Sequence, residues 1–180
     1  MVVFAFYVFD RHAECIYKKR WQDALPGASA TSLRPPSQST VANAPAPARQ
    51  SLKSDDDAKL IFGTVYSLRN MVRKLGGEDD RHDFPYACSF LSYRTSQYKL
   101  HYYETPTNIK FVMLTDVKAN SMRHALQQIY VNIYVEYVVK NALSPAEHPG
   151  GIGVDNELFE ASLDVFVERV LNTQPPDPRA

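Results

Sequence analysis

The residue types that could do chemistry in this 180-residue chain are scattered rather than clustered. Its five histidines fall in turns, in loops, on one strand and at a helix start; they are His12, His82, His101, His124 and His148. No two of them have the i, i+4 spacing that places two metal ligands on one face of a helix. We expect His101, which stands among tyrosines, to be a hydrogen-bonded strand residue. The histidine pattern therefore predicts no metal site.

The acidic, cysteine and glycine positions do not indicate catalysis either. Asp55–Asp57 is typical of a helix cap and Glu78–Asp80 of a solvated loop, so neither predicts an acid/base pair in a pocket. Cys15 and Cys88 stand singly in strand-like runs, which favours reduced thiols. The stretch Gly150–Gly153 follows a helix and lacks the Lys-Ser/Thr of a phosphate-binding loop. We therefore expect a non-enzymatic protein with no catalytic residue and no cofactor.

The composition narrows the class of partner. The 20 Lys and Arg residues balance the 20 Asp and Glu residues, so no net charge attracts nucleic acid or an anionic membrane. The chain has 11 Tyr and 9 Phe, and Tyr suits half-buried and interface positions. This balance favours a protein that binds other proteins.

The first structural element that the sequence predicts is a strand at the apolar run Val2–Phe9. Val3, Ala5, Tyr7 and Phe9 should lie on one side of it, and Phe4, Phe6 and Val8 on the other. A strand that is apolar on both sides is interior and needs a covering layer on each face. The run is too short to span a bilayer and lacks the basic start and cleavage site of a signal peptide. Ala13–Trp21 should return beside it as an edge strand, since Lys18–Arg20 suit an edge.

The segment Asp23–Ser54 differs in kind. It is rich in Ala, Pro and Ser and poor in large apolar residues, so we expect a flexible insertion within the domain. Asp55–Asp57 should then start a helix that ends at Leu75, before Gly76 and Gly77. One helical stripe should face the sheet: Ile61, Val65, Leu68, Met71, Val72 and Leu75.

The same helix carries a second stripe, which a single surface helix does not need: Phe62, Tyr66, Arg69 and Arg73. Its mixture of aromatic residues and arginine is typical of protein–protein interfaces. We interpret it as a partner interface. Packing beneath the domain's own loops or beneath the insertion is the alternative.

The second half of the chain predicts three strands and two helices. The strands are Pro85–Thr95, Gln97–Glu104 and Ile109–Thr115, with a tight turn at Thr105–Asn108. Tyr98, Leu100 and Tyr102 should be core residues. A helix capped by Asn120 or Ser121 should end near Asn141, and a last helix should be capped by Asp155. Residues 174–180 should form a disordered tail.

These elements predict a single α+β domain at residues 1–173. Its five-stranded antiparallel sheet should carry the first helix on one face and the last two helices on the other.

Several strings of the chain resemble one protein family: Tyr7–Arg11, Phe62–Arg69, Thr95–Lys110, Thr115–Asp116 and Ile133–Asn141. In this order they resemble the smallest longin-like (sedlin/synbindin-type) subunits of the transport protein particle, TRAPP. The resemblance covers nearly the whole chain except the insertion. It implies the longin fold, which has the order of strands and helices predicted above.

The resemblance also implies a function. TRAPP is a tethering complex of the early secretory pathway, and its core is the nucleotide-exchange factor of a Rab-type GTPase in endoplasmic reticulum-to-Golgi transport. The subunit would pair with a sister longin subunit, abut a more helical subunit, and be cytoplasmic and peripheral on Golgi and endoplasmic reticulum membranes. Exchange requires no bond-making residue. Lys59, Asn70 and Lys74, on the polar side of the helix, would be weak candidates for contact with the GTPase.

Two other functions fit the same elements. A small longin-type subunit of a cargo adaptor or coat would use this sheet and these helices to bind sorting peptides or sister subunits. A stand-alone regulatory domain would instead bind a small ligand.

Overall fold

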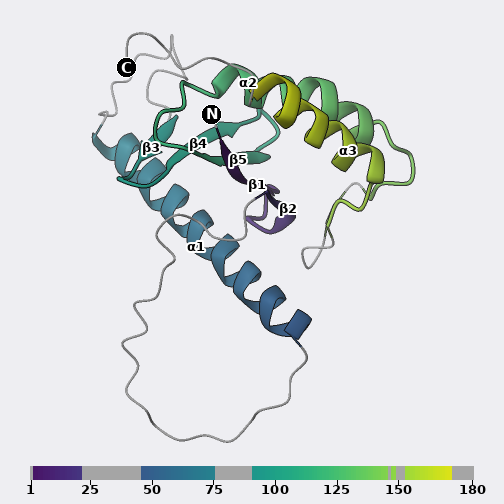
Figure 1. Ribbon diagram of the computed structural model, residues 1–180, viewed down its shortest axis with the longest axis horizontal. Coiled ribbons are helices and arrows are strands. Elements are labelled where there is room, and N and C mark those ends of the chain that lie inside the picture. Colours follow the sequence, from purple (N-terminus) through teal and green to yellow (C-terminus); the bar gives the residue numbers. More distant parts are fainter. Residues whose placement is uncertain (1, 22–45, 76–90, 146, 149–152, 172–180) are drawn as a thin grey trace, which may run out of the picture.

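The computed structural model of the chain describes residues 2–21, 46–75, 91–145, 147–148 and 153–171 (Figure 1). Five antiparallel strands form one sheet in the order β2-β1-β5-β4-β3. The strands are β1 Val3–Phe9, β2 Cys15–Arg20, β3 Ser92–Arg94, β4 Lys99–Glu104 and β5 Lys110–Thr115. The predicted α+β sheet is confirmed. The predicted strand Pro85–Thr95 is described only from residue 91, and its earlier part lies outside the described residues.

Strand β1 is interior, as its apolar run predicts. All seven of its residues are buried, and it pairs with β2 on one side and β5 on the other. The predicted facing is wrong at its start, because the register shifts between Val3 and Ala5. Val3 therefore packs with Phe6 and Val8, and Phe4 packs with Ala5, Tyr7 and Phe9. An irregularity of this kind turns the side chains that precede it to the opposite face.

Helices cover both faces of the sheet (Figure 1). Helix α1, Ala46–Leu75, crosses one face. The other face carries α2 (Arg123–Gln128), which continues as η1 (Ile129–Val139), and α3 (Glu157–Phe166), which continues as η3 (Val167–Leu171). In η1 the backbone N–H groups donate to the carbonyl five residues earlier instead of four. Lys140, just after η1, keeps this spacing: its N donates to Val135 O at 2.9 Å.

Helix α1 starts at Ala46, nine residues before the predicted cap at Asp55–Asp57. Its first turn contains no acidic residue, so the capping role predicted for the aspartates is wrong. The residues between 46 and 54 include Ala, Arg, Gln, Leu and Lys, which are good helix formers, and Pro47 is tolerated in a first turn. Part of the predicted insertion is therefore helical, and its residues 23–45 lie outside the described residues.

Two further caps differ from the prediction. The N-cap of α2 is Met122, which makes no side-chain cap, rather than Asn120 or Ser121. The N-cap of α3 is Asn156 rather than Asp155: its Oδ1 accepts from Leu158 N at 3.0 Å and from Phe159 N at 3.3 Å. Asn156 Nδ2 also donates to Tyr137 O at 2.8 Å, which ties α3 to η1. An amide can make both contacts, whereas an ionised carboxylate cannot donate.

The sheet separates two cores. The core beneath α2, η1 and α3 centres on Phe6, Phe111, Leu126, Phe159 and Leu163. The core beneath α1 contains Tyr7, Phe9, Val65, Leu100 and Tyr102. Leu100 and Tyr102 are buried and Tyr98 packs partly against them, as predicted for this hairpin strand.

The chain before α3 covers part of the outer edge of β2. Val154 N donates to Ile16 O at 2.7 Å. A Cβ at Gly153 would lie 3.0 Å from the same Ile16 oxygen, which is tighter than most Cβ contacts in proteins. The glycine therefore permits the close approach that covers this edge.

Candidate protein–protein interface on helix α1

The side chains of α1 divide into an inner and an outer side. Ala58 and Val65 are buried against the sheet, and Ile61, Leu68 and Val72 are half-buried beside them. Four of the six residues predicted to face the sheet therefore do so: Val65 is buried, and Ile61, Leu68 and Val72 are half-buried. The other two, Met71 and Leu75, are exposed, so their predicted facing is wrong.

The four residues predicted as a partner interface fall into two pairs. Phe62 and Arg69 turn toward the sheet and are half-buried, whereas Tyr66 and Arg73 are exposed. The structure thus brings only Tyr66 and Arg73 to the surface, and it uses Phe62 and Arg69 to join α1 to the sheet.

Aromatic rings connect the sheet to the outside of the helix. Phe62 packs on Phe9 of β1 with ring centroids 5.3 Å apart, and Tyr66 stacks on Phe62 at 6.1 Å. Tyr66 nevertheless keeps 55% of its surface exposed. A large aromatic residue that is supported from below and exposed above resembles the anchors found at protein interfaces.

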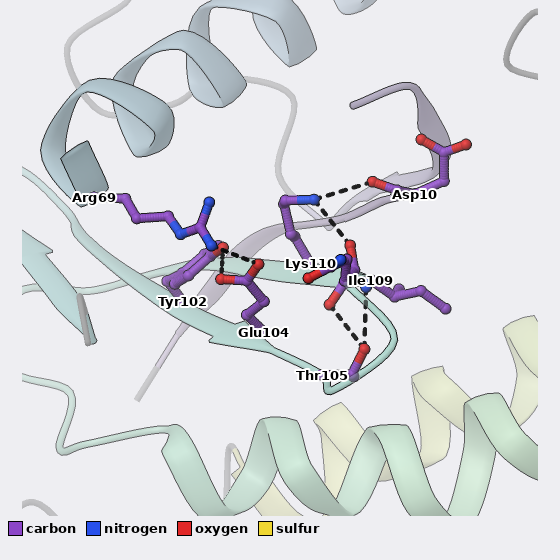
Figure 2. Close-up of polar contacts among 8 residues, drawn as sticks. Asp10, Arg69, Tyr102, Glu104, Thr105, Ile109 and Lys110 are labelled. Carbon is purple, nitrogen blue, oxygen red and sulfur yellow. Dashed lines mark hydrogen bonds and ion pairs between the residues drawn. The ribbon is translucent and has the colours of Figure 1, made fainter. Parts of the chain in front are cut away.

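A polar network fixes the same part of α1 over the hairpin (Figure 2). Arg69 Nη2 lies 3.0 Å from Glu104 Oε1 at the end of β4, and the Tyr102 hydroxyl donates to Glu104 Oε2 at 2.9 Å. Burial, together with the nearby Glu104 carboxylate, raises the pKa of the Tyr102 hydroxyl. Glu104 therefore accepts from a charged and a neutral donor at once, one from the helix and one from the sheet.

Lys110 lies across from Glu104 on the neighbouring strand. Its Nζ donates to the backbone oxygens of Asn108 at 2.8 Å and Asp10 at 3.3 Å (Figure 2). Burial lowers the pKa of the Lys110 ammonium group. The lysine thus joins the β4–β5 turn to the end of β1. In that turn Thr105 Oγ1 accepts from Ile109 N at 3.0 Å, and Asn108 takes a φ of 62°, a conformation that Asn tolerates.

The structure exposes several apolar side chains near this site that the sequence pattern did not predict to be exposed. Leu60, Met71 and Leu75 lie on the outer side of α1, and Leu91 and Tyr93 lie at β3. The spacing of Leu60, Met71 and Leu75, by 11 and 4 residues, places them on one line of a helix, which was the available signal. Together with Tyr66, these residues expose more apolar surface on α1 and β3 than is usual for the solvent-facing side of a helix.

The three residues predicted as candidates for contact with a GTPase lie on the same helix. Lys59 and Lys74 are exposed, whereas Asn70 is half-buried. None of the three takes part in an ion pair within the described residues.

The titratable residues considered for chemistry are dispersed in the described parts of the chain. No three His, Cys, Asp or Glu side chains come together there as metal ligands would. His101 is buried and its Nε2 lies 2.9 Å from Thr115 Oγ1, the hydrogen-bonded strand position predicted for it. The Cys15 thiol donates to Tyr17 O at 3.4 Å. Cys88, His82 and the run Glu78–Asp80 lie outside the described residues, as does most of Gly150–Gly153.

No helix in the described ranges is both long enough and apolar enough to cross a membrane.

Known proteins match nearly the whole chain. The model of the Sybindin-like family matches residues 3–170. The chain is 40% identical over 171 residues to the "Transport protein particle subunit bet5" of Schizosaccharomyces pombe, covering 93% of this chain and 96% of the relative. It is 34% identical over 167 residues to the human "Trafficking protein particle complex subunit 1", covering 93% and 92%. It is 34% identical over 181 residues to "Trafficking protein particle complex subunit BET5" of Saccharomyces cerevisiae, covering 96% and 99%.

These matches span both cores and all five strands, and they confirm the resemblance stated from the sequence strings. The chain belongs to the Sybindin-like family.

Proposed function

We propose that this protein is a core subunit of the TRAPP complex. It would contribute to the surface that exchanges nucleotide on a Rab-type GTPase, and to vesicle tethering in endoplasmic reticulum-to-Golgi transport. The observation that carries the proposal is that the alignments with TRAPP subunits cover nearly all of this chain and nearly all of each relative. A relative that matched only the shared sheet would support the fold alone.

The subunit would have no catalytic residue of its own. Exchange requires that the assembled complex bind the nucleotide-free GTPase more tightly than the nucleotide-bound form. That difference in affinity shifts the GTPase toward release of GDP without making or breaking a bond. A chain that supplies rigid surface is sufficient for this role, and the helices packed on both faces of the sheet make such a surface.

The sister longin subunit would dock on the outer side of α1 and on β3. Tyr66 and Arg73 would contact it directly, and the exposed Tyr93 of β3 would supply apolar area. Phe62 and Arg69 would hold α1 in place beneath the interface rather than enter it. Lys59, Asn70 and Lys74 would be candidates for contacts with the GTPase in the assembled complex. The more helical subunit would bind elsewhere.

The protein would reach membranes of the Golgi and endoplasmic reticulum as part of this complex, on their cytoplasmic side. Its location there would be peripheral.

Co-purification with the sister longin subunit tests the proposed interface. The double variant Tyr66→Ala/Arg73→Glu removes an exposed ring and reverses an exposed charge, and we expect it to lose most of the co-purifying partner. The matched control is Leu158→Ala/Lys140→Glu, which makes the same kinds of change at exposed positions of the opposite helical layer. The control should retain the sister subunit.

Equal retention by both variants would place the interface away from α1. Circular dichroism on each variant should show an unchanged fold, because all four positions are exposed and none contributes to either core. Failure of the wild-type chain to co-purify with any TRAPP subunit would contradict the proposed function itself.

A further inference from the structure

Four basic side chains gather at the end of the sheet where α2 begins. They are Arg94 on β3, Lys99 on β4, Lys118 in the turn after β5 and Arg123 at the start of α2. We call them the α2 basic cluster. They come from four separate segments of a chain whose total charge is zero, so their proximity results from the fold.

Register and hydrogen bonds place these residues together. Arg94 and Lys99 are direct cross-strand partners, so both project toward the α2 face. Lys99 Nζ donates to Ala119 O at 2.9 Å, next to Lys118. Arg123 lies four residues after Ala119. Burial raises the pKa of the Tyr103 hydroxyl on β4, and the nearby Arg123 charge acts to lower it.

The four residues of the cluster differ from five other basic residues, each of which has a carboxylate partner. Arg11, Lys19, Arg20, Arg69 and Lys140 each form an ion pair. In the described part of the chain, none of the four cluster residues does. Asp116 is the carboxylate closest in sequence, and it forms no ion pair there either.

Such an arrangement does not stabilise the fold. Like charges directly opposite on neighbouring strands repel, and Arg94 with Lys99 is such a pair. The Lys99 charge also contributes, after burial, to the lowered pKa of the neighbouring His101. A cluster that disfavours folding and is largely exposed is explained more readily by an external anion than by internal packing.

We infer that the α2 basic cluster is a contact site for an anionic phospholipid surface. The four groups come from four segments at one end of the sheet, and three of them are exposed, so they suit an extended layer of phosphates. Val2, which is 41% exposed, lies beside them because Asp116 N donates to Val2 O at 2.9 Å. Exposed basic residues next to an exposed apolar side chain are typical of surfaces that touch anionic membranes. This inference does not depend on the proposed exchange function.

Vesicle flotation of the full-length chain tests the inference. We expect binding to phosphatidylcholine vesicles that contain about one third phosphatidylserine, no binding to pure phosphatidylcholine, and weaker binding as salt rises. Lys118→Gln/Arg123→Gln should weaken vesicle binding about tenfold or more. Lys99 is left intact because it supports the 116–119 turn.

The matched control is Arg11→Gln/Lys140→Gln, which removes two exposed cations that are already paired. It should bind vesicles as the wild type does. Equal loss in both variants would show a net-charge effect and overturn the site, as would absence of vesicle binding by the wild type. Binding of polyglutamate or of soluble inositol phosphate, without vesicle binding, would also overturn it and assign the cluster to an acidic protein or to a free phosphate.

Discussion

Arg69 of α1 reaches Glu104 at the end of β4, 35 residues away, with Nη2 and Oε1 3.0 Å apart. Both side chains are partly shielded from solvent. The contact joins the helix to the hairpin whose sequence most resembles the TRAPP family. It therefore links the segment that identifies the protein to the helix proposed to bind its partner.

Separating this pair should loosen α1 from the sheet. Glu104→Gln should destabilise the chain by about 1 kcal/mol, since it weakens two hydrogen bonds that a carboxylate accepts. A double-mutant cycle with Arg69→Ala and Glu104→Ala should give a coupling energy of about 0.5–1 kcal/mol in urea unfolding. A coupling energy of zero would mean that the contact between Arg69 and Glu104 does not contribute to stability.

Two glycines should respond oppositely to alanine. At Gly153 the added Cβ would meet the Ile16 carbonyl at 3.0 Å, so Gly153→Ala should cost about 1–3 kcal/mol by moving the chain off β2. At Gly63, within α1, nothing lies within 4 Å, so Gly63→Ala should stabilise by about 0.5–1 kcal/mol. Urea unfolding of both variants measures the difference, and destabilisation at Gly63 would contradict the open space described there.

His101 should make stability depend on pH. Burial, with a smaller effect of the Lys99 charge, lowers its pKa to about 4 in the folded chain, from 6.5. The unfolded chain therefore takes up this proton first, and stability is lost as the pH falls from about 6.5 toward 4. His101→Gln should reduce the slope of unfolding free energy against pH between about pH 4 and 6.5. Above pH 7 the wild type and the variant should have similar slopes. Identical slopes throughout would contradict the burial of an uncharged imidazole.

Much of the fold could be predicted from local patterns. The apolar run at Val2–Phe9 indicated an interior strand, and the turn at Thr105–Asn108 indicated the hairpin, because both depend on residues close in sequence. The start of α1 could not be predicted, since helix propensity before Asp55 competed with a composition poor in apolar residues. The irregularity at the start of β1 depends on pairing with β5, more than 100 residues away.

The candidate interface was predicted only in part, for a geometric reason. Apolar residues surround much of α1, so periodicity alone does not define which line of the helix meets the sheet. Contacts with Phe9 and Glu104 turn Phe62 and Arg69 inward and leave Tyr66 and Arg73 outside. The exposed Met71 and Leu75 follow from the same rotation of the helix.

The proposed function requires that the protein complete an exchange factor. The decisive measurement is GDP release from a Rab-type GTPase by a TRAPP core reconstituted with the wild-type chain, without the chain, and with the chain alone. We predict acceleration by the complete core, little acceleration without the chain and none by the isolated chain. Equal GDP release with and without the chain in the core, or exchange by the isolated chain, would contradict its role as a non-catalytic surface subunit.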